Sequence, residues 1–524
     1  MGATDETIEA LKEAQQSPSE ELAKATFTSQ GWSQGDGVAT GSGLVHYDLE
    51  APAKKLYPVI TPLRNMIPRV AGDGGVATNW KAITAVNTTS MHMGVGEAAR
   101  SGVITNTVKE YTASYKGLGL ESFCTFESEY AGQNFDDVRA RAVESLLRSF
   151  FIGEEQIILG GNSSVALGTP ATATLATFTP SPASTLSNAS YSVQVVALTH
   201  DGQYRSSVAG GVPATADRTP GDGGSAVTFN GGASDASAAA TVTPAANDAI
   251  YATTTPIRGA FAYAWYWTHQ STSEIRLGAI TPTSSVVITA EPTGTQQITA
   301  HASDHSTDDK VFDGILTQIS EANSGSYYLD LANQSAAAAE ADFNAGKTVG
   351  TKLEGDGAGG IKQIDDALQS FWDNYRLSPD MMIVSAQELK NMTHLLIKSG
   401  GANLFQFNVG GTDGTVDGRT IAAGTVIGSY LNKFTMAGGQ MVRVMLHPNL
   451  APGTILFFST SIPYPLSNVN NVLQIKARRT YYQIEWPLRT RRYEFGVYAD
   501  ELLQNYFPPA FGVITNIADG VVAA

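Results

Sequence analysis

The stretch GDGAGG, residues 355–360, has the glycine spacing of a phosphate-binding loop that opens a helix. Asp380 lies twenty residues beyond its last glycine, where a dinucleotide site would place the carboxylate that binds the ribose. However, the residues before the loop do not have the pattern of a buried strand. Asp380 also precedes the strand pattern MMIVS, whereas a ribose-binding carboxylate should end one. We therefore expect a flexible loop that caps the following helix, and no cofactor.

A second candidate is HASDHSTDD, residues 301–309, which offers metal-ligand types at near-helical spacing: His301, Asp304, His305 and Asp308. The stretch is polar, and no surrounding pattern would hold these side chains rigid. It therefore predicts a flexible linker, and no metal site.

The third candidate, KARRTYYQIEWPLRTRR, is a basic stretch near the C-terminal end. Its cations are Lys476, Arg478, Arg479, Arg489, Arg491 and Arg492. Interleaved aromatic residues are typical of a nucleic-acid face, but alternation places Tyr482, Ile484 and Trp486 on the other face of a strand. Because the chain has a formal charge of −16, we expect ion pairs to neighbouring acidic subunits, with DNA contact as the alternative.

No catalytic constellation is recognisable, so we expect no catalytic residues and no enzyme. The eight histidines are scattered, and Cys124 is the only cysteine, which excludes an intramolecular disulfide framework. Its alternating apolar surroundings predict a buried structural thiol. The acidic N-terminus is unlike a signal peptide, and no run of 18 apolar residues predicts a membrane span.

The first half of the chain contains elements that cannot form a core alone. Residues 1–45 read as an extended arm after a short acidic helix, and the proline-rich residues 49–70 read as a docked connector. Period-two patterns on either side of the glycine-rich TTSMHMGVGEAARSG predict a long hairpin. Asn134 then stands at the N-cap of a long helix that runs to about Leu159 and ends at two glycines.

The composition changes after this helix. No lysine occurs between Lys116 and Lys310, and residues 165–300 are rich in Ser, Thr, Ala and Gly. Alternating segments at 191–207, with a hairpin turn at Asp201-Gly202, and at 260–292 predict strands. This segment resembles an immunoglobulin-like or fibronectin-III-like β-sandwich with Trp265 or Trp267 between its sheets. Its polar boundaries predict a separately folding insertion whose deletion leaves assembly possible.

The rest of the chain mixes helices and strands, so the predicted class is α+β. We expect helices at 310–320, 360–375 and 386–400, and strands at 381–385, 440–448 and 454–460.

The order of these elements resembles the major capsid proteins of tailed double-stranded-DNA bacteriophages, the Hong Kong 97-like fold. Six stretches carry the resemblance: TPLRNMIPRV, GEAARSG, EEQIILGGN, SPDMMIVSAQEL, MLHPNLAPGTILFF and YYQIEWPLRTRRYEFGVYADELL. It implies the following segments: arm and connector 1–70, extended loop hairpin 71–117, peripheral domain with spine helix 118–164, inserted sandwich 165–300, peripheral return 301–345, axial domain 346–465, and C-terminal strands 466–524.

The resemblance implies a structural protein that self-assembles into hexamers and pentamers of an icosahedral head around double-stranded DNA, which it contacts without sequence specificity. A separate scaffolding protein, a portal and a decoration protein are implied partners, with no membrane. The chain is expected in the virion, after assembly in the host bacterial cytoplasm. An encapsulin-like compartment and a β-sandwich adhesin or carbohydrate-binding protein are the alternatives. Members that form isopeptide cross-links carry a lysine near the loop tip, which this chain lacks.

Overall fold

The computed structural model describes residues 54–86, 93–133, 135–357, 359–399, 428–436, 438–465 and 467–522. The chain divides into two units, one of residues 1–57 with 131–137 and one of 58–130 with 138–524. The second unit contains nearly all of the described helices and strands. The predicted arm and the N-cap at Asn134 lie outside the described residues. No helix within the described ranges is long and apolar enough to cross a bilayer.

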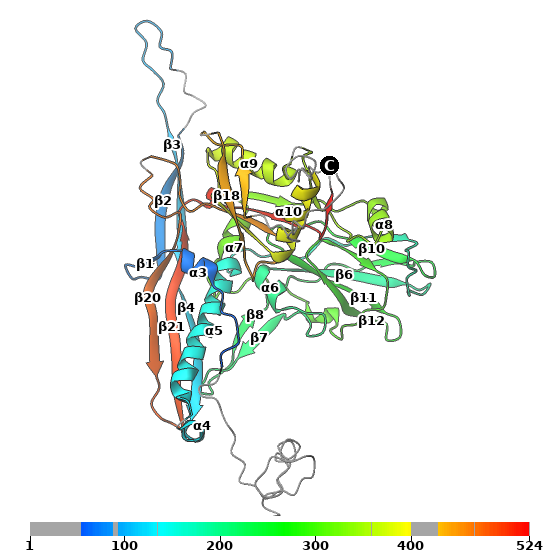
Figure 1. Cartoon of the computed structure of the whole chain (residues 1–524), viewed down its shortest axis with the longest axis horizontal. Coiled ribbons are helices and arrows are strands. Elements are labelled where there is room, and N and C mark those ends of the chain that lie inside the picture. Colours follow the sequence, from blue (N-terminus) through cyan, green and yellow to red (C-terminus); the bar gives the residue numbers. More distant parts are fainter. Residues whose placement is uncertain are drawn as a thin grey trace, which may run out of the picture. The chain divides into compact units, whose positions relative to one another are not determined.

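A long four-stranded sheet and a helix form one part of this unit (Figure 1). The strands, in spatial order, are β1 (Arg69–Ala71), β20 (Leu473–Glu485), β21 (Arg492–Asn505) and β4 (Lys116–Thr125). Helix α5, Val138–Gly160, covers one face, where Leu118 and Cys124 of β4 and Phe150 of α5 are buried in a common core. Leu118 and Cys124 lie an even number of residues apart on β4, so both side chains point to the face that the helix covers.

The predicted long helix is confirmed, although it begins at Val138, a few residues after the expected cap. Glu144 and Arg148 form an i,i+4 ion pair on it (2.6 Å). The helix ends where the Gly161 N–H donates to the Ile157 carbonyl. A Cβ at Gly160 would lie 2.5 Å from Nδ1 of His200, so the close approach of this side chain requires glycine there.

The predicted hairpin consists of β2 (Ala77–Val86) and β3 (Asn106–Ser114), paired antiparallel from Ala77–Ser114 to Val86–Asn106. The sequence pattern runs on from β3 through Cys124. The structure instead separates β3 from β4 at the buried Tyr115, because β4 leaves the hairpin to pair with β21. The hairpin therefore extends from the end of the long sheet (Figure 1).

A six-stranded sheet organises the α+β part of the unit, and the predicted class is confirmed. Its strands, in order, are β14 (Tyr327–Asp330), β22 (Gly512–Thr515), β19 (Ile455–Phe458), β16 (Met381–Val384), β18 (Gln440–Leu446) and β17 (Ser429–Asn432). Helices α9 (Lys362–Tyr375) and α10 (Ala386–Ser399) match their predicted ranges. This sheet takes strands from three of the predicted segments, and the domain boundaries at 345 and 465 stay predictions.

Short elements connect these parts. They are α3 (Pro62–Met66), α4 (Phe126–Gly132), α6 (His200–Arg205), α7 (Ile315–Ser320), α8 (Ala336–Asn344), β15 (Leu353–Glu354), β23 (Val521–Val522), and the 3-10 helices η1 (Ile298–Ala300) and η2 (Pro508–Ala510). The helix predicted at 310–320 is thus only one and a half turns long, because Gly314 approaches the end of α5 and its N–H donates to Gly161 O.

The segment after α5 folds as two facing antiparallel sheets. One contains β13 (Ser285–Ile288), β10 (Ala249–Thr253) and β5 (Thr174–Phe178), and the other β12 (Glu274–Thr281), β11 (Ala262–His269), β6 (Tyr191–Leu198) and β9 (Ala240–Val242). Trp265 and Trp267 are both buried in their shared core, and Trp265 Nε1 donates to Thr281 Oγ1 (2.8 Å). The immunoglobulin-like assignment stays a prediction.

The hairpin turn predicted at Asp201-Gly202 is wrong. These residues lie in α6, where Thr199 is the N-cap and its Oγ1 accepts the Gly202 N–H (3.1 Å). Asp201-Gly202 has a strong turn preference, but an aspartate is also stabilised in the first turn of a helix, because its negative charge interacts favourably with the helix dipole. The N-cap threonine was the signal for this alternative.

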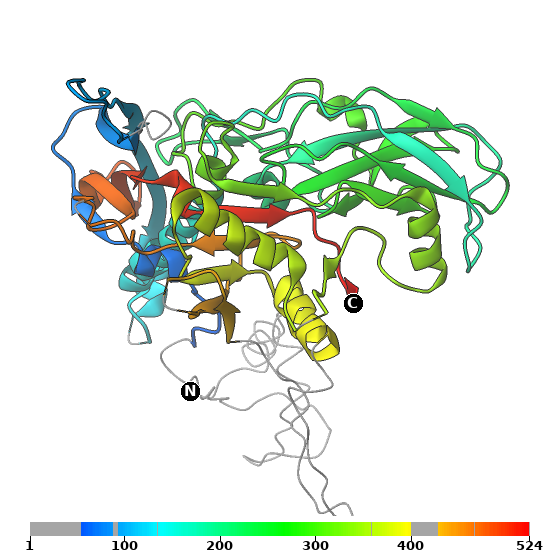
Figure 2. The ribbon, with the colours of Figure 1, turned by 90° about the horizontal axis from the view of Figure 1, so that it is seen from above.

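The expectation of flexible joints around the inserted segment is also wrong. Asn162 is buried, and its Nδ2 donates to both Val165 O (2.7 Å) and Ser306 O (2.8 Å), which joins the two ends of the segment. Asp304 accepts the Gly168 N–H (2.8 Å), and His301 is buried. Figure 2 shows the segment lying directly against the rest of the unit.

Candidate assembly surface

The β2–β3 hairpin exposes large apolar side chains that no described residue of its own unit covers. They are Val76, Ile83, Val86, Met93, Val95, Val103, Ile104 and Val108. Ile83 and Val108 are directly paired across the two strands and are 66% and 55% exposed. Cross-strand apolar pairs stabilise a sheet when a second layer buries them. Here the second layer is missing within the described part of the chain.

The described contacts of the hairpin with the rest of the unit lie at its root. Trp80 stacks on Tyr111, with ring centroids 5.7 Å apart, and meets the edge of Tyr506 at 6.0 Å. Lys109 Nζ donates to Asn323 O (2.6 Å). These contacts attach the hairpin to β21 and to the loop after α7. The distal residues therefore project without support from a core.

The loop at the end of the hairpin offers no amine nucleophile. Arg100 is the only long cation between Lys81 and Lys109 in the sequence. Lys81 lies opposite Glu110, with Nζ 3.9 Å from its carboxylate, and Lys109 is occupied at the root. A guanidinium stays protonated and cannot attack an amide.

Two buried glutamates near the end of α5 hold the connector that precedes the hairpin. Glu154 Oε2 accepts from Arg64 Nε (2.9 Å) and Tyr481 OH (2.6 Å), and its Oε1 accepts from Arg69. Arg69 also pairs with Glu501 of β21 (2.8 Å). We call these five residues the carboxylate hub. Removing one partner of a buried ion pair is costly, so the hub fixes connector, helix and sheet to one another.

The adjacent Glu155 holds the first turn of α3. Its carboxylate accepts the backbone N–H groups of Leu63 (2.9 Å) and Arg64 (2.6 Å), as an N-cap side chain would. His447 Nε2 donates to the same carboxylate (2.8 Å), since His447 Nδ1 accepts the Asn449 N–H (3.1 Å). A carboxylate from a distant helix thus replaces the cap that α3 lacks locally.

The chain of contacts continues into the inserted segment. His200 Nε2 donates to Asn449 O (2.8 Å), and its ring packs edge-on against Phe261. Burial lowers the pKa of His200 to about 4, so the ring is neutral at neutral pH. Burial also raises the pKa of Glu501, against the effect of Arg69.

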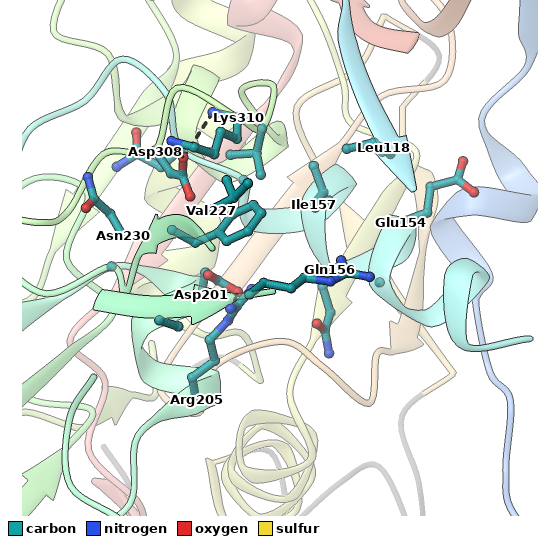
Figure 3. A pocket seen from close by; sticks show the side chains of 18 of the residues that line it. Leu118, Glu154, Gln156, Ile157, Asp201, Arg205, Val227, Asn230, Asp308 and Lys310 are labelled. Atoms are coloured by element: carbon teal, nitrogen blue, oxygen red, sulfur yellow. Dashed lines mark hydrogen bonds and ion pairs between the residues drawn. The ribbon is translucent and has the colours of Figure 1, made fainter. Parts of the chain in front are cut away.

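A groove of about 680 Å³ lies between α5, β4 and the inserted segment (Figure 3). Leu118 and Ile157 line one side, and Asn230 and Val227 come from the inserted segment. Two acid–base pairs lie in its wall, Asp201 with Arg205 (3.0 Å) and Asp308 with Lys310 (3.7 Å). Of the other charged residues there, Arg218 donates to Gly119 O (3.3 Å), Asp217 accepts from Thr228 (2.6 Å), and Glu154 pairs within the carboxylate hub. The groove therefore presents little net charge.

The glycine-rich loop is held by its own aspartate. Asp356 Oδ1 accepts the Gly360 N–H (2.6 Å), and the Ile361 N–H at the start of α9 donates to Tyr430 OH (2.9 Å). A two-residue strand, β15, does precede the loop, contrary to expectation. Asp380 precedes β16 and accepts the Thr460 N–H (3.0 Å).

The four candidate metal ligands do not converge. His301 packs against Tyr266, whereas the His305 ring contacts Asn230 and Ser303. Asp304 caps the Gly168 backbone, and Asp308 faces Lys310. Across the described ranges, no group of three or more His, Cys, Asp or Glu side chains could hold a metal ion.

Four of the six cations of the basic stretch have partners in their own chain. The pairs are Lys476–Asp73, Arg478–Asp500, Arg491–Glu127 and Arg492–Glu494. Arg479 lies over the Tyr482 ring at 3.8 Å. The expected ion pairs to neighbouring subunits stay a prediction for the exposed Arg479 and Arg489.

Glu154 and Glu155 are the residues that sequence reasoning missed. They stand in EEQIILGGN, where two acids interrupt the apolar end of a long helix. Acidic side chains are rarely buried unless they are paired. The position of these two acids on the core face of the helix was therefore the signal that could have predicted buried partners for them.

Together, the supported root and the exposed distal hairpin leave a run of apolar surface uncovered in the part of the chain that the structure describes. No protein-family model matches the chain, and no curated protein matches it in sequence. Solved structures similar to it include the capsid of a native GTA particle (TM-score 0.39, 8% identity, 91% of this chain and 97% of that one). The capsid of the Myoviridae phage XM1 is similar too (0.38, 9%, 92% and 100%). So is the SrpI encapsulin of Synechococcus elongatus (0.32, 8%, 89% and 92%).

Proposed function

We propose that this chain is a major capsid protein, which self-assembles into the hexamers and pentamers of an icosahedral phage head enclosing double-stranded DNA. The observation that carries the proposal is the β2–β3 hairpin, with its directly paired and exposed Ile83 and Val108. Contiguous exposed apolar surface on a folded chain marks an interaction site.

The energetics favour other copies of the chain as the cover. A two-stranded ribbon is at best marginally stable in water, because it has one layer and no core. Burying apolar surface contributes roughly 25 cal/mol per Å², so a neighbour that covers the hairpin stabilises both the ribbon and the lattice. A projecting hairpin of this kind suits a shell, in which each subunit reaches across another.

The carboxylate hub supports the same role. Glu154 and Arg69 connect the helix to the connector that leads into the hairpin, so a force on the hairpin reaches α5 through buried ion pairs. A lattice subunit needs such a rigid base beneath its projecting hairpin. In this proposal, a scaffolding protein and a portal act in assembly in the host bacterial cytoplasm, and a decoration protein is an addition to the virion.

The encapsulin-like alternative predicts a shell that encloses protein instead of DNA, and nucleic-acid content separates the two. For the capsid proposal, the variant Ile83→Thr/Val108→Thr keeps β-branched side chains and removes apolar surface. We expect it to reduce the yield of shells in negative-stain micrographs at least tenfold, while the subunit melts as the wild type does.

The matched control is Ile83→Val/Val108→Ile, which exchanges the two side chains and conserves apolar volume. It should assemble as the wild type does. If the threonine variant forms normal shells, or if the unsubstituted chain forms none with its scaffold, the proposed function is wrong.

A further inference from the structure

We propose that residues 516–522 form a strap that ties helix α10 to the inserted segment, and that ionisation of the buried Glu388 on α10 loosens this strap. The strap follows β22 and ends with β23, which lies beside α10 (Figure 1). The pH of the solution would then set how firmly the inserted segment is held. This device acts within one subunit, so it goes beyond the proposed function and does not require a shell.

The first end of the strap holds the inserted segment. Asn516 Oδ1 accepts the N–H of Ser284 (2.6 Å), which is buried directly before β13. Asn516 Nδ2 donates to Leu331 O, so both halves of this side-chain amide are used. An opening of the strap at Asn516 would therefore leave the Ser284 N–H without its acceptor.

The second end of the strap is held by one turn of α10. Four contacts join the two: Gln387 Nε2 with Ile517 O (3.3 Å), Asn391 Nδ2 with Ala518 O (3.5 Å), Asn391 Oδ1 with the Gly520 N–H (3.0 Å), and Lys390 Nζ with Asp519 (2.6 Å). Beyond them, β23 pairs with β15 in parallel. Two of the three side chains on the helix are neutral amides.

Glu388 shares these two amides with the strap. Its side chain is buried (0% exposed), and its carboxyl oxygens accept from Gln387 Nε2 (3.0 Å) and from Asn391 Nδ2 (3.4 Å). The same donors thus serve both the carboxyl group and the carbonyls of the strap. Because an ionised carboxylate is a stronger acceptor than a neutral group, ionised Glu388 would draw both amides away from the strap.

The surroundings of Glu388 keep it neutral. In the described ranges, no cation forms an ion pair with it, and β16 carries no charged residue. The charged groups on the other elements around α10 are paired elsewhere: Lys390 with Asp519 (2.6 Å), Lys352 with Asp342 (2.6 Å), and Glu354 with Lys362 (3.4 Å). Burial raises the pKa of Glu388 to about 8, and the charge of Asp519 acts in the same direction.

Opening of the strap lets water reach Glu388, so that its pKa returns towards the ordinary value of 4.5. Between pH 4.5 and about 8, the open form binds fewer protons than the closed form does. Each rise of one pH unit in this window therefore favours opening about tenfold. Above about pH 8 the carboxyl group is ionised in both forms, and the dependence ends.

Hydrogen exchange of the unassembled full chain tests this device. The variant Glu388→Gln keeps the shape of the side chain and cannot ionise. Because both proteins have the same strap sequence, the ratio of their exchange rates at one pH cancels the intrinsic chemistry of the amides. In peptides covering 516–522, the wild-type rate divided by the variant rate should rise about tenfold per pH unit between pH 5.5 and 7.5.

The matched control is Glu340→Gln, which removes a partly exposed carboxylate on α8. Its strap should exchange as that of the wild type at every pH. A constant ratio for Glu388→Gln, or an equal pH dependence of the ratio for Glu340→Gln, would overturn the proposal.

The inserted segment gives the second readout. In the wild type, the amide of Ser284 should lose protection together with the strap as the pH rises, because its acceptor belongs to Asn516. Asn516→Ala should expose the Ser284 amide at every pH in this range. Opening of the strap without any change at Ser284 would show that the strap does not hold the inserted segment, and the proposal would be wrong.

Discussion

The inserted segment and the β2–β3 hairpin both leave the body of the subunit and return, yet the first buries its large apolar side chains and the second exposes them. The inserted segment stacks two sheets and buries Trp265 and Trp267 between them. The hairpin is a single ribbon, and Ile83 and Val108 stay exposed. The number of layers explains the difference, because a sheet buries one of its faces only against a second element. A region with one layer must find its second layer in another molecule.

The two regions are also attached differently. Arg258 of the inserted segment donates to the carbonyls of Ile319 (2.9 Å) and Ser320 (2.7 Å) at the end of α7. The Ser284 N–H donates to Asn516 Oδ1 (2.6 Å), next to β22. These contacts argue against a clean excision of residues 165–300, whereas the described contacts of the hairpin gather at its root, around Trp80 and Lys109.

The largest expected difference between the regions is in the cost of losing an apolar side chain. Trp265→Ala should lower the free energy of unfolding by about 3–5 kcal/mol, because it empties a buried site. Ile83→Ala should change it by about 0.5 kcal/mol or less in the unassembled subunit. Urea unfolding of the subunit measures both. Similar costs at the two positions would contradict the contrast.

Two glutamates on α5, one buried in the carboxylate hub and one partly exposed, allow a matched test of how firmly the base of the hairpin is held. Glu154→Ala should cost about 3 kcal/mol, since it leaves Arg64 without its buried counter-charge and Arg69 with Glu501 alone. Glu144→Ala removes the partly exposed pair with Arg148 and should cost below about 0.5 kcal/mol. Equal melting temperatures of the two variants would show that the hub does not fix the base of the hairpin.

Lowering the pH should destabilise the inserted segment, which contains the buried His200. The pKa of His200 is lowered by burial to about 4, so the unfolded chain binds a proton first as the pH falls below 6.5. Stability is therefore lost between pH 6.5 and about 4, by about 2.5 kcal/mol at pH 4.5 for this residue. His200→Gln should reduce the fall in unfolding free energy between pH 7 and 4.5 by that amount. An unchanged pH dependence would contradict the burial of this ring.

The smallest expected effect concerns covalent linkage through the hairpin. No lysine lies near its tip, so mature particles boiled in detergent should give one band near 55 kDa. The Lys81→Arg and Lys109→Arg variants should give the same band. A ladder that survives boiling in the unsubstituted protein, and disappears in either variant, would show that these strand lysines reach an amide in a neighbour.

Local patterns predicted much of the fold. The helix at Val138–Gly160, the hairpin strands, α9 and β16 follow from periodicity that neighbouring residues set by themselves. The predictions that were wrong concern segments whose local sequence is compatible with two structures. Asp201-Gly202 suits both a turn and a first helical turn, and polar residues 301–309 suit both a linker and a buried, hydrogen-bonded joint.

Composition and periodicity alone determined that this chain has an α+β body, a β-rich insertion and a hairpin with too few apolar residues to form a core, since each follows from residues close together in sequence. Only the tertiary structure decided that Glu154 and Glu155 are buried. Their partners, Arg64, Tyr481 and His447, come from 90 to 327 residues away. Burial of a charge depends on such distant partners, which no local pattern specifies.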